Sequence, residues 1–211
     1  QGANLILVAR SADKLETLAD ELRARYRIQV ETWPCDLVNR GARAVLAADL
    51  ASREIHTLVN NAGFGSIGDS TALPQERISA EVELNVVALT DLTRTVLPGM
   101  RQRDRGAVIN IASTAAFQPI PGFTTYAATK SYVLRLSIGL WAELHDTGVR
   151  VLAVCPGPTD TGFFTAAGND QVMGHRRSVE QVVATSFKAL RRHRPYVVDG
   201  VGNTITVSYT H

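Results

Sequence analysis

The sequence STAAFQPIPGFTTYAATK, residues 113–130, follows a short apolar run and leads into a helical pattern at 123–146. Tyr126 and Lys130 are four residues apart, so a helix places both side chains on one face. Because a nearby ammonium favours the phenolate, this pairing predicts a lowered pKa for Tyr126. With the Ser113 hydroxyl as a partner, Tyr126 becomes a candidate proton donor or acceptor. The alternative for so short a pattern is an ordinary exposed tyrosine and lysine.

The composition indicates one compact domain over residues 1–211, because 211 residues with 45% hydrophobic content can bury a substantial core. The net charge is only +2 and the basic residues are dispersed, so we expect no nucleic-acid partner. No apolar run is long enough for a membrane span, and no signal peptide is recognisable. Cys35 and Cys155 are expected to be reduced, partly buried thiols in a cytoplasmic protein, and the alternative is the one bridge that two cysteines can form. The sequence suggests no metal site.

Strand-like and helical patterns alternate along the chain. The expected strands cover 4–9, 28–33, 56–60, 107–112, 149–155 and 195–198. The expected helices cover 12–26, 39–53, 75–102, 123–146 and 178–190. This alternation predicts βαβ units and therefore an α/β fold, a doubly wound parallel sheet flanked by helices.

Some details of these elements are expected from single residues. The continuously apolar run at 4–9 predicts a strand buried on both faces, and Pro34 is expected to end the second strand. Pro98 and Gly99 should bend or break the last turn of the third helix. The tail at 199–211 alternates like a strand but is left unassigned.

A Gly-rich segment superficially matches a dinucleotide fingerprint. Gly63, Gly65 and Gly68 spell GxGxxG after a strand. The helix begins only after Pro74, so its N-terminus cannot lie against a pyrophosphate as that motif requires. We interpret the segment as a loop, and the chain offers no other phosphate-cradling loop.

Polar residues gather where the expected strands end, and ligands bind at that edge of a parallel sheet. In NNAG, residues 60–63, small residues let a flat ring approach the backbone while asparagines brace neighbouring strands; the alternative is a capped turn. Asn85 is a poor mid-helix residue that could hold a water or a bent carbonyl if buried, although on its own an exposed position is the simpler interpretation. The turn at 156–161 has threonines that can donate to an amide, and the alternative is a rigid turn without a ligand.

Taken in order, NNAG, the mid-helix Asn, the strand-end Ser, YxxxK and PGxxxT resemble the short-chain dehydrogenase/reductase family from Gly2 to about residue 198. The resemblance implies a single Rossmann-type domain and a catalytic tetrad made of Asn85, Ser113, Tyr126 and Lys130. In that family the Tyr is the general acid or base and the Ser polarises the carbonyl or alcohol. The Lys lowers the Tyr pKa and holds the nicotinamide ribose, and the Asn supports a water-linked proton relay.

The implied reaction is hydride transfer between a nicotinamide cofactor and a small-molecule carbonyl or secondary alcohol. One alternative is a catalytically silent relative that binds a nucleotide or a partner. By the same resemblance, a homodimer or homotetramer is expected through the helices at 75–102 and 123–146.

The resemblance also assigns cofactor-binding residues, namely Arg10, Ser11, Asp36, Leu37, Asn60, Ala62, Gly63, Tyr126, Lys130, Pro156, Gly157, Thr159 and Thr161. Of these, Asp36 matches the residue that meets the adenine. NAD-specific sites place an acid where this chain has Arg10 and Ser11, so we expect NADP(H) in preference to NAD(H). The alternative is an NAD-linked enzyme with Arg10 merely on the surface.

The sequence departs from the family at its start, because the family's first strand and its TGxxxGxG turn have no counterpart. In the family's sheet that strand lies between the second and the fourth, so two internal strands would lack a neighbour, at a cost of about 1 to 3 kcal/mol for each buried unpaired group. We expect the molecule to carry a further N-terminal segment, which an intact mass above 22.8 kDa would reveal.

The substrate-covering region of the family corresponds to residues 162–177. There Phe163, Phe164 and Met173 are expected either to cover an apolar substrate or to pack beneath the loop. In the loop after the strand-end Ser, the residues expected to face the substrate are Ala115, Phe117 and Gln118.

Overall fold

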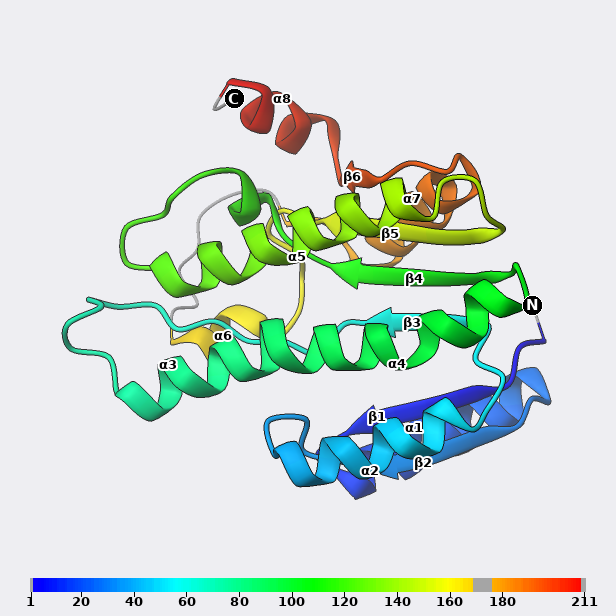
Figure 1. The fold of residues 1–211 in the computed structure, drawn as a ribbon. Coiled ribbons are helices and arrows are strands. Elements are labelled where there is room, and N and C mark those ends of the chain that lie inside the picture. Colours follow the sequence, from blue (N-terminus) through cyan, green and yellow to red (C-terminus); the bar gives the residue numbers. More distant parts are fainter. Residues whose placement is uncertain (1, 169–175, 210–211) are drawn as a thin grey trace. The chain divides into compact units, whose positions relative to one another are not determined.

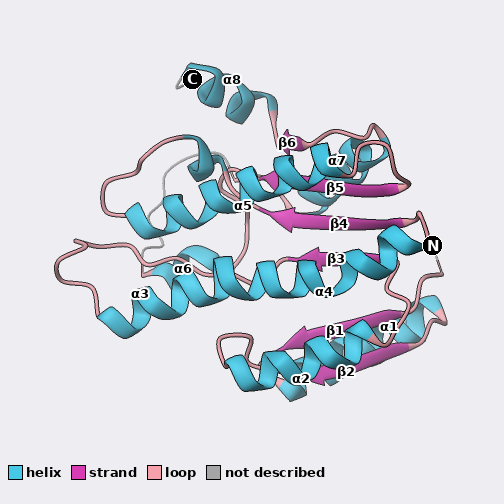
Figure 2. Cartoon of the chain, in the orientation of Figure 1, coloured by secondary structure: helices cyan, strands magenta, loops and turns pink. Residues whose placement is uncertain are grey.

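The computed structural model describes residues 2–168 and 176–209. The chain divides into two compact units, Gln1–Asp49 and Leu50–His211, each built around its own parallel sheet (Figure 1). Helices and strands alternate in both units, as Figure 2 shows by colour. The predicted α/β class, with parallel strands flanked by helices, is confirmed.

The first unit contains a two-stranded sheet. Its elements are β1 (Leu5–Ala9), α1 (Ala12–Tyr26), β2 (Val30–Pro34) and most of α2 (Arg40–Ala51). The two strands are parallel, with Leu5 opposite Val30 and Ala9 opposite Pro34. Pro34 is thus the last residue of its strand, which a proline tolerates because the strand ends there.

The second unit contains a four-stranded parallel sheet in the order β3-β4-β5-β6. Its strands are β3 (Thr57–Asn60), β4 (Gly106–Ile111), β5 (Val149–Cys155) and β6 (Tyr196–Val198). Its helical segments are α3 (Gln75–Val82), η1 (Glu83–Ala88), α4 (Leu89–Gln102), η2 (Thr114–Phe117), α5 (Thr124–Glu143), α6 (Phe163–Ala167), α7 (Val179–Arg191) and α8 (Val201–Tyr209).

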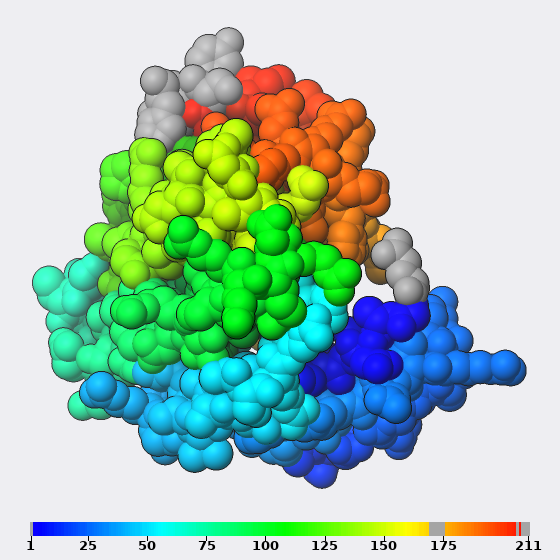
Figure 3. Space-filling view, turned by 45° about the vertical axis from the view of Figure 1, so that its right-hand side comes forward, coloured from blue at the N-terminus to red at the C-terminus, as the bar shows by residue number. Residues whose placement is uncertain are grey.

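Two helices cover one face of this sheet and a third covers the other. α4 and α5 lie in front of the strands in Figure 1, and α7 lies behind β5 and β6. On the α5 face Val133 packs with Ala153 and Cys155, and on the α7 face Leu152 packs with Ala189. In the space-filling view α4 and α5 form one continuous green to yellow-green surface (Figure 3).

The strand β1 differs from its prediction, because Leu5 to Val8 are only partly buried and Ala9 is exposed. In the described part of the chain β1 pairs only with β2, and β3 pairs only with β4. Each is therefore an edge strand, which explains its exposure.

One expected helix differs in detail from its prediction, and the tail that was left unassigned is helical. The helix expected at 75–102 is α-helical, then π-helical over Glu83–Ala88, then α-helical again; Pro98 lies inside α4, which continues to Gln102. The strand-like tail contains a helix, α8, over Val201–Tyr209. The Val, Ile and Thr residues of this tail have low intrinsic helix propensities, but propensity is a weak guide and the segment is helical nevertheless.

Candidate active site

Ser113, Tyr126 and Lys130 meet at the carboxyl end of β4. Ser113 is the second residue after that strand and caps η2, its hydroxyl accepting a hydrogen bond from the Ala115 amide at 3.1 Å. Tyr126 and Lys130 lie one turn apart on α5 and are only 7% and 6% exposed. The alternative of two ordinary surface side chains is therefore wrong.

The Lys130 ammonium is held by the backbone of β4. Its Nζ donates to the Ile111 carbonyl at 2.7 Å and lies 5.6 Å from the centre of the Tyr126 ring. Burial lowers the pKa of Lys130 to about 8, while Cys155 and Glu81 act to raise it. At neutral pH the ammonium form therefore still predominates.

The Tyr126 ring is enclosed by aromatic side chains. Phe123 stacks on it with centroids 4.3 Å apart, and Phe163 packs against it at 5.2 Å. Burial raises the pKa of Tyr126, a hydrogen bond with Ser113 lowers it, and Glu81 raises it further. The predicted lowering is wrong, because loss of water outweighs the effect of a nearby ammonium. At neutral pH the phenol keeps its proton and can act as a donor.

Asn85 lies in the π-helical segment and is 1% exposed. Its Nδ2 donates to the Phe64 carbonyl at 2.8 Å and to Thr129 Oγ1 at 3.1 Å, and its Oδ1 accepts from the Phe64 amide at 3.2 Å. The simpler expectation of an exposed position is wrong. The side chain holds a backbone carbonyl, which was the buried alternative, and π-helical turns are frequent at functional sites.

Asn60 braces the strands as the NNAG pattern predicts. Its Nδ2 donates to Asn110 Oδ1 at 2.8 Å across the β3–β4 pair and to Thr93 Oγ1 at 2.9 Å. Asn110 in turn donates to Ser137 Oγ at 3.0 Å. The sequence reasoning missed these partners, although an asparagine inside the apolar run AVINIA is a recognisable signal.

Ala62 and Gly63, the last two residues of NNAG, differ in their exposure and in their contacts. Ala62 is exposed, whereas Gly63 lies against the tetrad: a β-carbon there would come within 2.9 Å of Asn85 Oδ1 and 3.6 Å of Lys130 Nζ. A bare backbone beside a buried ammonium suits the hydroxyls of a ribose. These residues therefore fit the nicotinamide-ribose end of a dinucleotide.

The GxGxxG segment is a loop, as expected, because α3 begins only at Gln75. The glycine at position 65 is required by close packing and not by phosphate binding. A β-carbon at that position would lie 2.5 Å from Phe123 Cε2 and 2.9 Å from Tyr126 Cδ2. The glycine thus lets the loop approach the aromatic side chains around the phenol.

The turn after β5 is braced from two sides. The Pro156 carbonyl accepts from Thr114, and the Pro158 carbonyl accepts from the Arg177 amide at 3.0 Å. Arg177 also forms a two-contact ion pair with the buried Asp199, with Nε and Oδ2 2.6 Å apart. Arg177 and Asp199 were not anticipated from the sequence.

The side chains of this turn are already engaged within it. Thr159 Oγ1 donates to the Gly157 carbonyl at 3.0 Å, and the exposed Thr161 accepts from the Phe163 amide at 3.4 Å. Gly157 faces Asn203 of α8, whose Nδ2 would be 2.4 Å from an added β-carbon. Asn203 is a further residue that the sequence reasoning missed.

The remaining predicted cofactor residues lie in the first unit. Arg10 and Ser11 follow β1, and Asp36 follows β2; all three are exposed. Leu37 is buried, and its carbonyl accepts from Arg43 Nη1 at 2.6 Å. Because β1 and β2 are parallel neighbours, their carboxyl ends lie at one edge of this small sheet.

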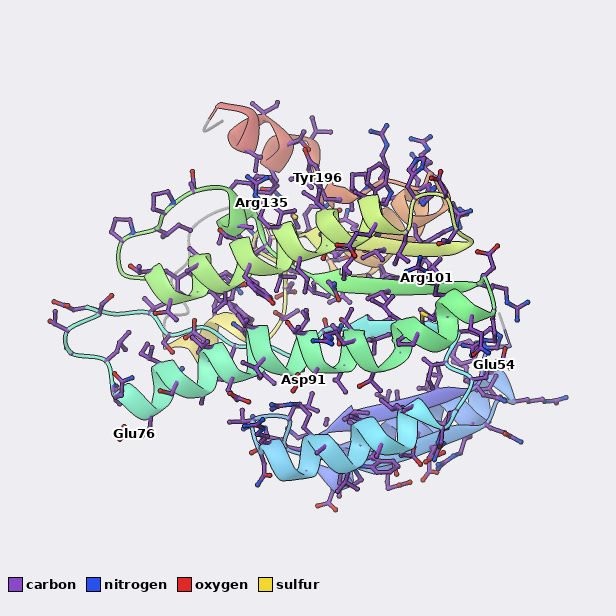
Figure 4. All side chains as sticks on the ribbon, in the orientation of Figure 1. Glu54, Glu76, Asp91, Arg101, Arg135 and Tyr196 are labelled. Carbon is purple, nitrogen blue, oxygen red and sulfur yellow. The ribbon has the colours of Figure 1, made fainter. Side chains whose placement is uncertain are left out.

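The predicted substrate-facing residues are only partly brought to the site. Ala115 packs with Tyr126, whereas Phe117 contacts Tyr196 of β6, labelled in Figure 4, at 5.9 Å between ring centres. Phe163 packs on Tyr126, and Phe164 packs edge-on against Phe163 at 5.3 Å. Gln118 is partly buried in the same loop, and Met173 lies outside the described residues.

The described residues contain no group of three or more His, Cys, Asp or Glu side chains able to hold a metal ion. Cys35 and Cys155 are both free and buried, as predicted for thiols. None of the helices described is long and apolar enough to cross a membrane.

Comparison with known proteins gives consistent relatives. The family model described as short chain dehydrogenase matches residues 1–172. The NADP-dependent 3-hydroxy acid dehydrogenase YdfG of Salmonella typhi is 37% identical over 183 residues, 82% of this chain and 71% of that protein. The very-long-chain 3-oxoacyl-CoA reductase of Bos taurus is 32% identical over 160 residues, 74% of this chain. The chain spans about half, 51%, of that reductase.

A solved structure matches the fold closely. The short-chain dehydrogenase from Sphingobium yanoikuyae in complex with NADPH has a TM-score of 0.92 at 32% sequence identity, over 99% of this chain and 82% of that one. The ordered motifs, the parallel sheet with its strand-end Ser113, Tyr126 and Lys130, and these matches agree. The chain belongs to the short-chain dehydrogenase family.

Proposed function

We propose that the protein is an oxidoreductase that uses NADP(H) to interconvert a carbonyl compound and a secondary alcohol. The observation that carries the proposal is the buried Tyr126 phenol, whose pKa the Ser113 hydroxyl acts to lower and whose ring centre lies 5.6 Å from Lys130 Nζ. A protonated phenol, a hydroxyl and a cation at one strand end form a proton-donating site for a developing alkoxide. The family relatives that are named as dehydrogenases and reductases support it.

The proposed reduction divides the work between cofactor and protein. When bound, the nicotinamide supplies the hydride that the carbonyl carbon receives. Ser113 and Tyr126 orient the carbonyl oxygen through their hydroxyls, and Tyr126 Oη gives its proton to that oxygen. Lys130 stabilises the tyrosinate that is left, and oxidation of the alcohol runs through the same groups in reverse.

Several residues would hold the cofactor. Lys130 and the backbone at Gly63 suit the nicotinamide ribose, because they lie together at the end of β3. The turn from Pro156 to Thr161 would meet the carboxamide, and Asn60 and Ala62 would line the path toward the adenosine. By the family resemblance, Asp36 would meet the adenine, and Leu37 is a further residue assigned to the cofactor.

The preference for NADP(H) rests on charge. Arg10 and Ser11 are exposed after β1, where an acid would select NAD. A guanidinium there favours a 2′-phosphate. Relatives whose names include NADP or NADPH support this choice.

The substrate class follows from the surroundings of the phenol. Phe123 and Phe163 flank Tyr126, so we expect carbonyl compounds with apolar substituents. A bulky-bulky ketone specific alcohol dehydrogenase from Comamonas testosteroni, with a TM-score of 0.86 and 29% identity, supports testing bulky ketones first. A single-domain organisation, a cytoplasmic location and a homodimer or homotetramer remain predictions from the sequence.

The test is a substrate panel with the full-length protein. Loss of NADPH absorbance is followed with small aldehydes, bulky aromatic ketones and 3-oxo esters, and then with NADH. We expect turnover with the bulky apolar ketones and NADPH. Absence of NADPH binding at any concentration tested would favour the silent alternative instead.

A further inference from the structure

Glu81 is a glutamate buried in the second unit, on α3, one helical turn before Asn85. It is 0% exposed, and neither carboxylate oxygen has a hydrogen bond of normal geometry among the described residues. The hydroxyl and amide of Ser66 act to lower its pKa. Burying a carboxyl without hydrogen-bond partners lowers the stability of the folded protein. A group that is nevertheless buried in this way is a candidate for a functional role.

The charged and titratable groups around Glu81 come from three elements. Arg77 lies four residues earlier on α3, Ser66 belongs to the loop after β3, and Tyr126 and Lys130 face it from α5. Burial raises the pKa of Glu81, whereas Ser66, Arg77 and Lys130 lower it.

Arg77 is engaged elsewhere. Its guanidinium donates to Ser66 Oγ at 3.0 Å, to the Gly65 carbonyl at 3.2 Å and to the Ala166 carbonyl at 2.9 Å. It thereby ties the loop to α6. Arg77 on the same helix and Lys130 on the facing helix both act to lower the pKa of Glu81, and the effect of Arg77 is the larger.

Lys130 has two acidic neighbours that favour its charged form, Cys155 and Glu81. Burial raises the pKa of Cys155 to about 12, so that thiol is neutral near pH 7. Glu81 is the neighbouring carboxyl, and when it is ionised it places a negative charge near the ammonium. The same charge also acts on Tyr126.

We propose that Glu81 is a positioning residue for the reaction, whose carboxylate keeps the proton on Lys130 and on Tyr126 at neutral pH. This inference rests on the proposed function. Glu81 touches neither substrate nor cofactor in this role and acts through the two α5 side chains. This role would account for a carboxyl that is buried in α3 without a hydrogen-bond partner among the described residues.

The consequence has a definite sign. A carboxylate favours the protonated form of both neighbours, so removing its charge lowers the pKa of Lys130 and that of Tyr126. Carbonyl reduction needs both protons, and activity is therefore present below these pKa values and lost above them. In the wild type the alkaline fall should begin near pH 8, where Lys130 titrates.

The experiment is the pH profile of kcat/KM for ketone reduction by Glu81→Gln. The alkaline limb should move to lower pH, reducing the ratio of activity at pH 8 to that at pH 6 by roughly threefold or more relative to wild type. Glu81→Asp keeps the charge and should keep the wild-type limb. Glu76→Gln is the matched control, because Glu76 is an exposed glutamate at the start of the same helix (Figure 4).

Two further measurements separate the outcomes. NADPH affinity, measured by fluorescence across the same pH range, should weaken at lower pH in Glu81→Gln than in wild type, since Lys130 would hold the ribose. Glu81→Met fills a similar volume without charge and replaces the Gln variant if that variant does not fold, with the same expected shift.

A uniform loss of activity in Glu81→Gln with an unchanged limb would show a merely structural role and overturn the inference. An inactive wild type that also fails to bind NADPH would contradict the proposed function instead, so the two failures are distinguishable.

Discussion

The two units handle charge in opposite ways. In the second unit Tyr126, Lys130 and Glu81 are all buried, and burial moves the pKa of each from its ordinary value. In the first unit Arg10 and Asp36 are exposed, at the ends of strands that are themselves partly exposed. Proton transfer benefits from a site without water, whereas attraction of a cofactor phosphate needs only an accessible charge.

The scaffolds beneath these groups differ in the same way. Strand β5 is buried along its whole length except at Arg150, with sheet neighbours on both sides. Strand β1 has one neighbour in the described part of the chain. We therefore expect the second unit to be sensitive to substitutions in its interior and the first to be sensitive mainly in its cofactor choice.

The largest expected effect is on the proton donor. Tyr126→Phe should lower kcat for ketone reduction by about 10³-fold, because it removes the transferred proton and leaves the ring packing in place. Steady-state kinetics measure the loss, and NADPH binding should be retained. Tyr132→Phe, an exposed tyrosine on the same helix, is the control and should stay within about twofold of wild type. Comparable activity of the two variants would exclude Tyr126 as the donor.

The next effect concerns the interior of the two sheets. Leu152→Ala removes a fully buried side chain from β5 and should lower the free energy of unfolding by about 3 kcal/mol. Leu7→Ala in the partly exposed β1 should cost about half of that, because less apolar contact is lost. Urea unfolding measures both. Equal losses would show that the two sheets are equally well packed.

A smaller effect is expected on cofactor choice. Arg10→Asp should lower the ratio of kcat/KM for NADPH to that for NADH by roughly tenfold or more, because an acid repels the 2′-phosphate and binds the 2′-hydroxyl. Activity with NADH should remain. The control is Lys14→Asp on α1, also exposed. An unchanged ratio in Arg10→Asp would support the NAD-linked alternative.

The smallest effect concerns the aromatic side chains around the phenol. Phe163→Ala should raise KM for bulky ketones by about fivefold with a lesser change in kcat, since Phe163 packs on Tyr126 without donating or accepting a proton. Kinetics with a bulky and a small ketone measure the selectivity. Phe187→Ala on the exposed face of α7 should leave both values unchanged. A loss of kcat alone would point to a displaced Tyr126.

Much of this fold could be predicted from periodicity, because each apolar run is short and each amphipathic run is long. The predictions for Tyr126 and Asn85 were wrong, because the pKa of one and the burial of the other depend on tertiary contacts. The pKa of Tyr126 depends on how completely its ring is desolvated, which spacing along a helix cannot show. The burial of Asn85 depends on its contact with Phe64, which is distant in sequence.

Other parts of the site were hidden for the same reason. The hydrogen-bonded chain from Asn60 through Asn110 to Ser137 joins three elements that are adjacent only in the folded protein. Arg177 lies shortly before α7 and Asp199 directly after β6, and the two form an ion pair. The sequence around neither residue has a distinctive pattern. Glu81 is one of two glutamates in α3, and only its burial distinguishes it from Glu76.

The central claim is that the buried phenol of Tyr126 serves a hydride transfer to a carbonyl carbon. The most direct test uses NADPH carrying deuterium at both C4 positions, incubated with the full-length protein and the best ketone from the panel. We predict one deuterium on the carbinol carbon of the alcohol product, formed at least about 10³-fold more slowly by Tyr126→Phe. NADPH that binds but transfers no deuterium to any carbonyl compound, or labelled product formed equally fast by Tyr126→Phe, would contradict this account.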